Sequence, residues 1–132
     1  MGPIKLGPIK QQPMQTDRLT DLSYLNEASA GNRKFIKNMI ETFIAQTPEL
    51  VKILKETSEK QDWIEFRKIM HKFKPTLAMM GINSLKDDVT FLETNVKQGL
   101  HLEKVPEKVL NIESICQKAL IELKKELSAF SE

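Results

Sequence analysis

The sequence predicts an all-α protein, arranged as an antiparallel up-down-up-down four-helix bundle with a short extra N-terminal helix. Four segments carry apolar residues at the spacing of about 3.6 residues that is typical of a helix with one buried face. No stretch alternates apolar and polar residues over the length of a strand. The connections between the segments are short, and short connections make neighbouring helices run in opposite directions.

The chain has 132 residues, of which 40% are hydrophobic and 29% charged, as is typical of one globular domain with a single core. We assign this domain to residues 17–132. Residues 1–16 contain a partly repeated Gly-Pro-Ile-Lys text and are expected to be a disordered tail, the end of a linker or a cloning remnant. They hold no apolar run long enough for a signal peptide or a membrane span, so no membrane contact is expected.

The charge and cysteine content narrow the class of protein. A formal net charge of +2 is close to balance, and no aromatic stacking face is visible, so a nucleic-acid partner is disfavoured. The single cysteine, Cys116, excludes an internal disulfide and fits a cytoplasmic protein. It lies on the apolar side of the last predicted helix, which indicates a packing role. We expect the protein to be a monomer.

The first two helices are predicted from their ends. A short helix is expected from Thr20 to about Ser29, ending near Gly31, and a long helix begins at Asn32, a favourable N-cap residue. Pro48 interrupts the long helix, but the apolar residues keep the same helical phase on both sides of it. We therefore predict one kinked helix rather than two. The apolar side is formed by Ile36, Ile40, Phe43, Leu50, Val51 and Leu54, with Phe35, Met39 and Ile44 widening it.

The next helix begins after Asp62, which together with Glu65 has the form of a capping box. It is expected to end near Gly81, since glycine readily adopts the left-handed conformation that follows many helices. Its apolar side is formed by Phe66, Ile69, Met70, Phe73, Leu77 and Met80.

Two further helices complete the prediction. Asn83 or Ser84 can cap the first of them, and Gly99 ends it. The last helix has Pro106 in its first turn, where proline is favoured. Their apolar sides are formed by Leu85, Val89, Leu92 and Val96, and by Val109, Ile112, Cys116, Leu120, Leu123 and Leu127.

His71 is the candidate reactive residue. At about 100° per residue it lies about 140° from the middle of the apolar side of its helix, so it should face water. Lys74 follows three residues later on the same face. Pro75 has no N–H to donate to the His71 carbonyl oxygen, which predicts a kink beside the ring. Ala78 and Gly81 are small and would leave room above the ring for the surface of another protein.

The residues around His71 are basic or small. A neutral imidazole has one ring nitrogen with a free lone pair and can act as a nucleophile. Neighbouring cations disfavour the imidazolium and favour a product that carries added negative charge. The expected partner-binding surface consists of Ile64, Arg67, Lys68, Lys72, Pro75 and Ala78, beside Lys74.

Other kinds of site are disfavoured. The sequence has neither GxxxxGK[ST] nor GxGxxG, so no nucleotide site of the usual kinds is expected. The second histidine, His101, lies thirty residues after His71 in a predicted loop and is expected to be exposed. Neither histidine has the sequence spacing of a metal ligand pair. We therefore expect no cofactor and no bound metal.

These features resemble the histidine-containing phosphotransfer (HPt) domains of multi-step two-component signalling. The central motif is formed by His71, Phe73, Lys74, Thr76 and Gly81. The likeness extends through Asp21-Leu22-Ser23-Tyr24-Leu25, Phe43, Thr47-Pro48-Glu49-Leu50, Asp62-Trp63 and Leu92-Glu93. One position departs from the pattern, because the family usually has glycine directly after the lysine, where this chain has Pro75.

The resemblance implies a phosphorelay intermediate without an ATP site of its own, and so not an enzyme in isolation. His71 would accept a phosphoryl group from the aspartyl phosphate of a response-regulator receiver domain and pass it to an aspartate of another receiver. Lys74 would stabilise the transferring group, and Glu93 would hydrogen-bond the non-reacting ring nitrogen of His71. Mg²⁺ is expected on the receiver. A hybrid sensor histidine kinase is a further expected partner, or the parent chain if this domain is a segment of one.

Two alternatives from other classes stay open. A non-catalytic helical adaptor would use the same surface to bind a partner, with His71 incidental to binding. A basic nucleic-acid-binding bundle is the weaker alternative, because acidic residues are nearly as numerous as basic ones.

Overall fold

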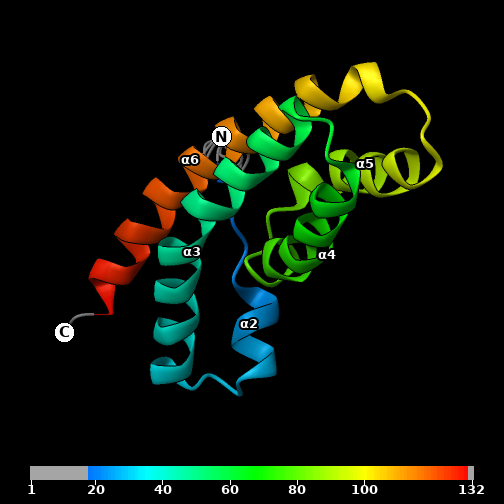
Figure 1. The fold of residues 1–132 in the computed structure, drawn as a ribbon. Coiled ribbons are helices and arrows are strands. Elements are labelled where there is room, and N and C mark those ends of the chain that lie inside the picture. Colours follow the sequence, from blue (N-terminus) through cyan, green and yellow to red (C-terminus); the bar gives the residue numbers. More distant parts are fainter. Residues whose placement is uncertain (1–17, 131–132) are drawn as a thin grey trace, which may run out of the picture.

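The computed structural model describes residues 18–130, and within this range every regular element is a helix and none is a strand. The prediction of an all-α protein is therefore confirmed. The expected tail, residues 1–16, lies outside the described residues, as do residues 17, 131 and 132 of the expected domain. The elements are α2 (Ser23–Ala28), α3 (Arg33–Glu59), α4 (Trp63–Met79), η2 (Asn83–Leu85), α5 (Lys86–Gln98), η3 (Leu102–Lys104) and α6 (Val105–Ala129) (Figure 1).

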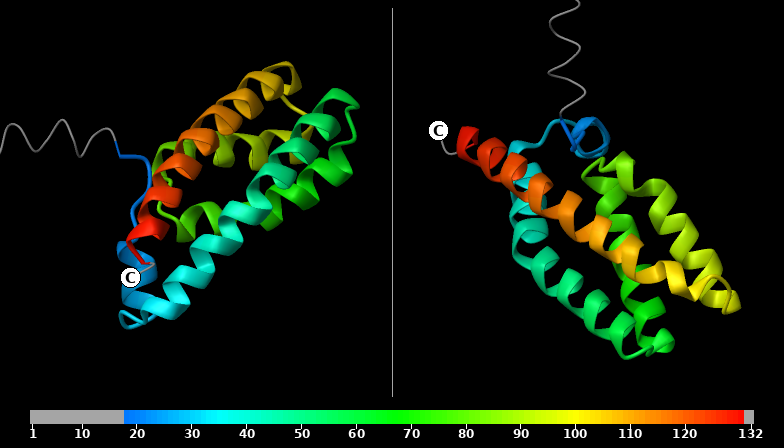
Figure 2. Two further views of the ribbon diagram at one scale, coloured as in Figure 1. Left: turned by 90° about the vertical axis from the view of Figure 1, so that its left-hand side faces the viewer. Right: turned by 90° about the horizontal axis from the view of Figure 1, so that it is seen from above.

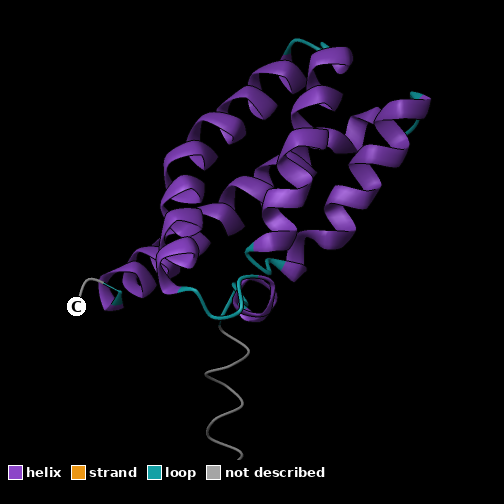
Figure 3. Cartoon of the chain, turned by 90° about the horizontal axis from the view of Figure 1, so that it is seen from below, coloured by secondary structure: helices purple, strands orange, loops and turns teal. Residues whose placement is uncertain are grey.

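The four long helices pack around one core. Helix α3 contacts α4 and α6, and α5 contacts α4 and α6, so that each long helix has two neighbours. Figures 1 and 2 show α3 and α6 running side by side. Figure 3 shows the short α2 near the loops at one end of the helices. The largest fully buried side chains are Phe43, Phe66, Phe73, Leu25, Ile40, Leu54, Met70, Met80, Leu85, Leu92, Ile112 and Leu123.

Helix α3 is continuous through Pro48, as its unbroken apolar phase predicts. Asn32 caps its N-terminus, with its side-chain oxygen accepting a hydrogen bond of 3.0 Å from the Phe35 backbone N–H. The predicted apolar side is buried, whereas Phe35 at its margin is 43% exposed. Because Pro48 is exposed while Thr47 is buried, the proline ring lies on the solvent side of α3, away from the core.

Helix α4 begins at the predicted N-cap, since the Asp62 carboxylate accepts a hydrogen bond of 3.2 Å from the Glu65 backbone N–H. The capping box is only half formed. The Asp62 backbone N–H donates to the Thr57 carbonyl oxygen, at 2.9 Å, because the short turn after α3 already supplies that acceptor. All of the residues predicted for the apolar side of α4 are buried. Helix α4 continues through Pro75 to Met79.

Gly81 has a role different from the one expected from the sequence. Its φ of +67° fits the predicted helix end, and a Cβ added at its α-carbon would point at the N-terminal segment of the described residues. An added Cβ would overlap the Asp21 backbone oxygen and lie 2.8 Å from the Asp21 carbonyl carbon. The Asp21 backbone N–H donates to the Met80 carbonyl oxygen at 3.0 Å. Because Gly81 has no side chain, the segment around Asp21 of the same chain can pack against it. The expectation that Gly81 leaves room for a partner is therefore wrong.

Glu122 of α6 holds the same N-terminal segment from the other side. Its carboxylate accepts hydrogen bonds from the Leu19 backbone N–H (2.7 Å), the Thr20 backbone N–H (3.0 Å) and the Thr20 hydroxyl (2.9 Å). Arg18 adds an ion pair of 3.2 Å with Glu126. These bonds satisfy backbone donors that no secondary structure satisfies, so residues 18–21 are fixed between α6 and the end of α4.

The start of α5 differs from the prediction. Asn83 and Ser84 lie in the 3₁₀ turn η2, and neither supplies a side-chain cap to α5. Asp87 and Asp88 occupy the first turn instead, where carboxylates interact favourably with the helix dipole. Gly99 ends α5 with a φ of +70°, as predicted.

Helix α6 completes the core. Pro106 lies in its first turn, as predicted. Cys116 is buried on the inner face, which confirms its packing role. No helix between residues 18 and 130 is long and apolar enough to cross a membrane.

Candidate functional site

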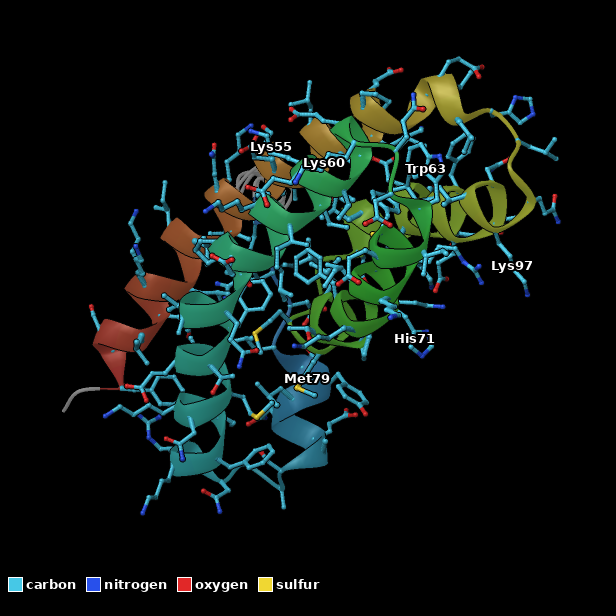
Figure 4. The ribbon with its side chains drawn as sticks, in the orientation of Figure 1. Lys55, Lys60, Trp63, His71, Met79 and Lys97 are labelled. Carbon is cyan, nitrogen blue, oxygen red and sulfur yellow. The ribbon has the colours of Figure 1, made fainter. Side chains whose placement is uncertain are left out.

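His71 is exposed on α4, as its helical phase predicts. Its neighbour Met70 is 2% exposed and Phe73 is fully buried, so the inward side of α4 is anchored by these two residues at this level. Figure 4 shows the His71 side chain projecting from α4 away from the core. The rotation of α4 about its own axis, set by apolar burial, therefore presents the imidazole to solvent.

A hollow lies beside His71 between α4 and α5. Ile64, Arg67 and Lys68, three residues of the expected partner-binding surface, line it, and Ile64 is 72% exposed. Glu93 reaches the same hollow from α5. The complete lining is Ile64, Phe66, Arg67, Lys68, Met70 and His71 from α4, and Leu92, Glu93, Thr94, Lys97 and Gln98 from α5.

The remaining predicted partner-binding residues lie outside this lining. Lys72, Pro75 and Ala78 are exposed on α4 but do not line the hollow. Lys74 is also outside the lining, although its side chain crosses to α5. The predicted surface is therefore divided into a hollow on one side of His71 and an open helix face toward the end of α4.

Lys74 and Glu93 form an ion pair between the two helices. The Lys74 Nζ lies 2.9 Å from Glu93 Oε1, and the two side chains are 54% and 30% exposed. Among the hydrogen bonds of residues 18–130, Glu93 has this bond to Lys74 and none to the His71 ring. The expected role of Glu93 in orienting the imidazole stays a prediction.

Three exposed residues of the hollow were missed by the sequence-based prediction: Thr94, Lys97 and Gln98 of α5. A signal for one of them exists, because Lys97 follows Glu93 by one helical turn and must share its face. Figure 4 places Lys97 on α5. The sequence does not show which part of α5 lies opposite His71.

The hollow has an excess of positive charge. Arg67, Lys68 and Lys97 line it, against a single carboxylate, Glu93. Guanidinium and ammonium groups stabilise phosphoryl oxygens electrostatically and by charge-assisted hydrogen bonds. The exposed imidazole of His71 therefore lies beside a surface that favours anionic groups.

The other candidate groups are placed elsewhere. Burial raises the pKa of the Cys116 thiol to about 12, so this cysteine is not a nucleophile at neutral pH. His101 is exposed, as expected, with a φ of +54°, and its ring centroid lies 6.5 Å from that of Phe91. Residues 18–130 contain no group of three or more His, Cys, Asp or Glu side chains that could hold a metal ion.

No protein-family model matches the chain, and comparison with the curated proteins and with the solved structures returns no match. A functional assignment therefore depends on the residues and geometry of His71 and its surroundings. These residues place an exposed imidazole beside several cations, an arrangement that can contact a small anionic group.

Proposed function

We propose that this chain is a phosphoryl carrier of the HPt kind, with His71 as the phosphoacceptor and response-regulator receiver domains as its partners. In this proposal α3, α4, α5 and α6 form an antiparallel up-down-up-down four-helix bundle that holds the imidazole at a fixed place on its surface. The observation that carries the proposal is the exposed His71 beside a basic hollow, on a helix whose opposite side is fully buried.

The proposed reaction needs little from the bundle besides a positioned nucleophile. A ring nitrogen of neutral His71 attacks the phosphorus of an aspartyl phosphate, the P–O bond to the aspartate breaks, and the carboxylate leaves. A second receiver reverses these steps, so that its aspartate takes the phosphoryl group and His71 is regenerated. Phosphoryl transfer depends mainly on alignment and charge stabilisation. Arg67, Lys68 and Lys74 supply cations on this side, and the receiver supplies Mg²⁺.

The surroundings of His71 fit a docking surface for a receiver. Ile64 places an apolar side chain next to the basic residues, at 72% exposure. Ala78 and Pro75 are exposed on the same helix and offer a surface without long side chains. Apolar contact at the centre and complementary charge around it are typical of transient protein interfaces. Lys72 would contribute to steering the acidic pocket of the receiver toward His71.

The proposed setting is the cytoplasm, and the proposed carrier is a monomer. The unpaired thiol of Cys116 supports a reducing compartment. A hybrid sensor histidine kinase is a candidate source of the phosphoryl group, through its receiver domain.

The competing function is a helical adaptor that binds the same partners without phosphoryl transfer. Exposed Ile64 and the basic hollow would serve an adaptor equally well. The two functions differ in whether His71 is chemically modified.

Labelling with phosphorylated receivers and with phosphoramidate tests the proposal. The wild-type protein should acquire label that is lost in mild acid, as phosphohistidine is, whereas His71→Gln should acquire none. The matched control is His101→Gln, which removes the other histidine and should label normally. Both variants should keep the wild-type free energy of unfolding to within about 0.5 kcal/mol, since both side chains are exposed. Label that persists in His71→Gln, or that resists acid, would refute the assignment.

A further inference from the structure

The ion pair between Lys74 and Glu93 joins α4 to α5 next to the proposed phosphoacceptor. Lys74 lies three residues after His71 and so belongs to the next turn on the same side of α4. Its ammonium group, however, is directed to Glu93 Oε1 at 2.9 Å. Of the two lysines three residues away from His71, Lys68 and Lys74, Lys74 therefore has a carboxylate partner already in the unphosphorylated protein.

Glu93 is the one carboxylate among the described residues that line the hollow. The other charged residues of the lining are Arg67, Lys68 and Lys97, apart from His71 itself. A carboxylate at this place repels an incoming phosphoryl group, and it also neutralises Lys74, a cation one helical turn from His71 that could offset that repulsion. Both effects work against phosphorylation of His71.

The Lys74–Glu93 ion pair is weak enough for Lys74 to exchange Glu93 for another anion. The Lys74 and Glu93 side chains are 54% and 30% exposed, and ion pairs with this much solvent contact contribute little to stability. A phosphoryl group carries about two negative charges and three acceptor oxygens, against one charge and two oxygens on a carboxylate. Lys74 would therefore prefer the phosphoryl group once one is bound to His71.

We propose that Glu93 holds Lys74 away from His71 in the resting protein, and that Lys74 exchanges Glu93 for the phosphoryl oxygens when His71 is phosphorylated. This inference rests on the proposed function. Glu93 is then a positioning residue that acts through Lys74: it slows the phosphorylation of His71 and competes with the phosphoryl group for the same cation. Removal of the Glu93 carboxylate should therefore speed up the phosphorylation of His71. If Glu93 instead oriented the imidazole, its removal would slow the reaction.

Phosphoramidate separates this effect from receiver docking, because it is a small donor that needs no protein partner. In the reaction a ring nitrogen of His71 attacks phosphorus, the P–N bond of the donor breaks, and neutral ammonia leaves with the three protons that the nitrogen of zwitterionic phosphoramidate carries. Lys74 forms no covalent bond and keeps its protons, while its ammonium group moves from the carboxylate to the phosphoryl oxygens.

The test is the rate of phosphoramidate labelling in Glu93→Gln. We expect labelling to be about two- to fivefold faster than in the wild type, which corresponds to about 0.4–1 kcal/mol at about 1.4 kcal/mol per tenfold. The matched control is Glu113→Gln, which removes the carboxylate of another inter-helix pair, Lys55–Glu113, of similar length (3.0 Å) and exposure (38% and 26%). Glu113 lies on α6, away from the hollow, and its removal should leave the labelling rate unchanged.

A double-mutant cycle tests whether Glu93 acts through Lys74. Lys74→Ala should label more slowly than the wild type, and adding Glu93→Gln to it should give little further change. Equal or slower labelling in Glu93→Gln, or the same acceleration with and without Lys74, would overturn this inference while leaving His71 as the phosphoacceptor. Absence of label on His71 in the wild-type protein would instead refute the proposed function, and this inference with it.

Discussion

Gly81 and Gly99 end α4 and α5 in the same left-handed conformation, but only Gly81 touches another part of the chain. Their φ angles are +67° and +70°. An added Cβ at Gly81 would overlap the backbone of Asp21, whereas an added Cβ at Gly99 would meet no atom of residues 18–130 within 4 Å. The substitutions Gly81→Ala and Gly99→Ala therefore have the same conformational cost, but only Gly81→Ala adds a steric clash.

The expected losses follow from this difference. Placing alanine in the left-handed region costs about 1–2 kcal/mol, and this should be the whole effect of Gly99→Ala. Gly81→Ala carries the same cost and also displaces Asp21, whose N–H donates to the Met80 carbonyl oxygen at 3.0 Å. Losing that hydrogen bond adds about 0.5–1.5 kcal/mol, so the total should be about 1.5–3.5 kcal/mol before any loosening of residues 18–20 is included.

Denaturant unfolding of the two variants beside the wild type measures these losses, with the midpoint as the readout and a constant slope as the check on two-state behaviour. Gly81→Ala should be less stable than Gly99→Ala by at least about 0.5 kcal/mol. Equal losses would show that the approach of Asp21 to Gly81 is not a tight one. A folded Gly81→Ala protein that labels with phosphoramidate but no longer accepts a phosphoryl group from a receiver would restore Gly81 to a place in the partner surface.

Two further predictions concern the docking surface and the buried thiol. Ala78→Glu should keep the wild-type free energy of unfolding to within about 0.5 kcal/mol and should label normally with phosphoramidate. Its rate of phosphoryl transfer from a phosphorylated receiver should fall at least about tenfold, because a bulky anion would repel the acidic pocket of the receiver. The control is Ala45→Glu, which adds the same side chain on the exposed side of α3. An equal fall in phosphoramidate labelling and in transfer from a receiver in Ala78→Glu would count against docking at Ala78. The Cys116 thiol should resist alkylation at pH 8 in the folded protein and react after unfolding, since a rise in pKa from 9.0 to about 12 lowers its thiolate fraction about a thousandfold. Rapid alkylation of the folded protein would contradict its burial.

The helices could be predicted from the sequence because their signals are local. The inward residues of α4, from Phe66 to Met80, follow one helical period, and Asp62 and Gly99 mark helix ends by backbone chemistry that involves only neighbouring residues. The failed prediction at Asn83 and Ser84 has a physical reason as well, since a cap residue specifies a start only when the following residues enter an α-helix directly, and here a 3₁₀ turn comes first.

The α4 side of the candidate site was determined by the sequence alone. Once the apolar residues of α4 are assigned to the core, His71 must face solvent, with Ile64, Arg67 and Lys68 near it. This follows because residues on one helix have a fixed angular relation that does not depend on how the helices pack.

The tertiary structure decided what lies opposite α4. It placed Thr94, Lys97 and Gln98 in the hollow, paired Lys74 with Glu93, and brought Asp21 against Gly81. These contacts depend on the distance and register between segments far apart in the chain, which are set by how side chains of several helices fill one core together. Helical periodicity predicts the direction in which each side chain points, but it does not predict which side chain of another helix that side chain contacts.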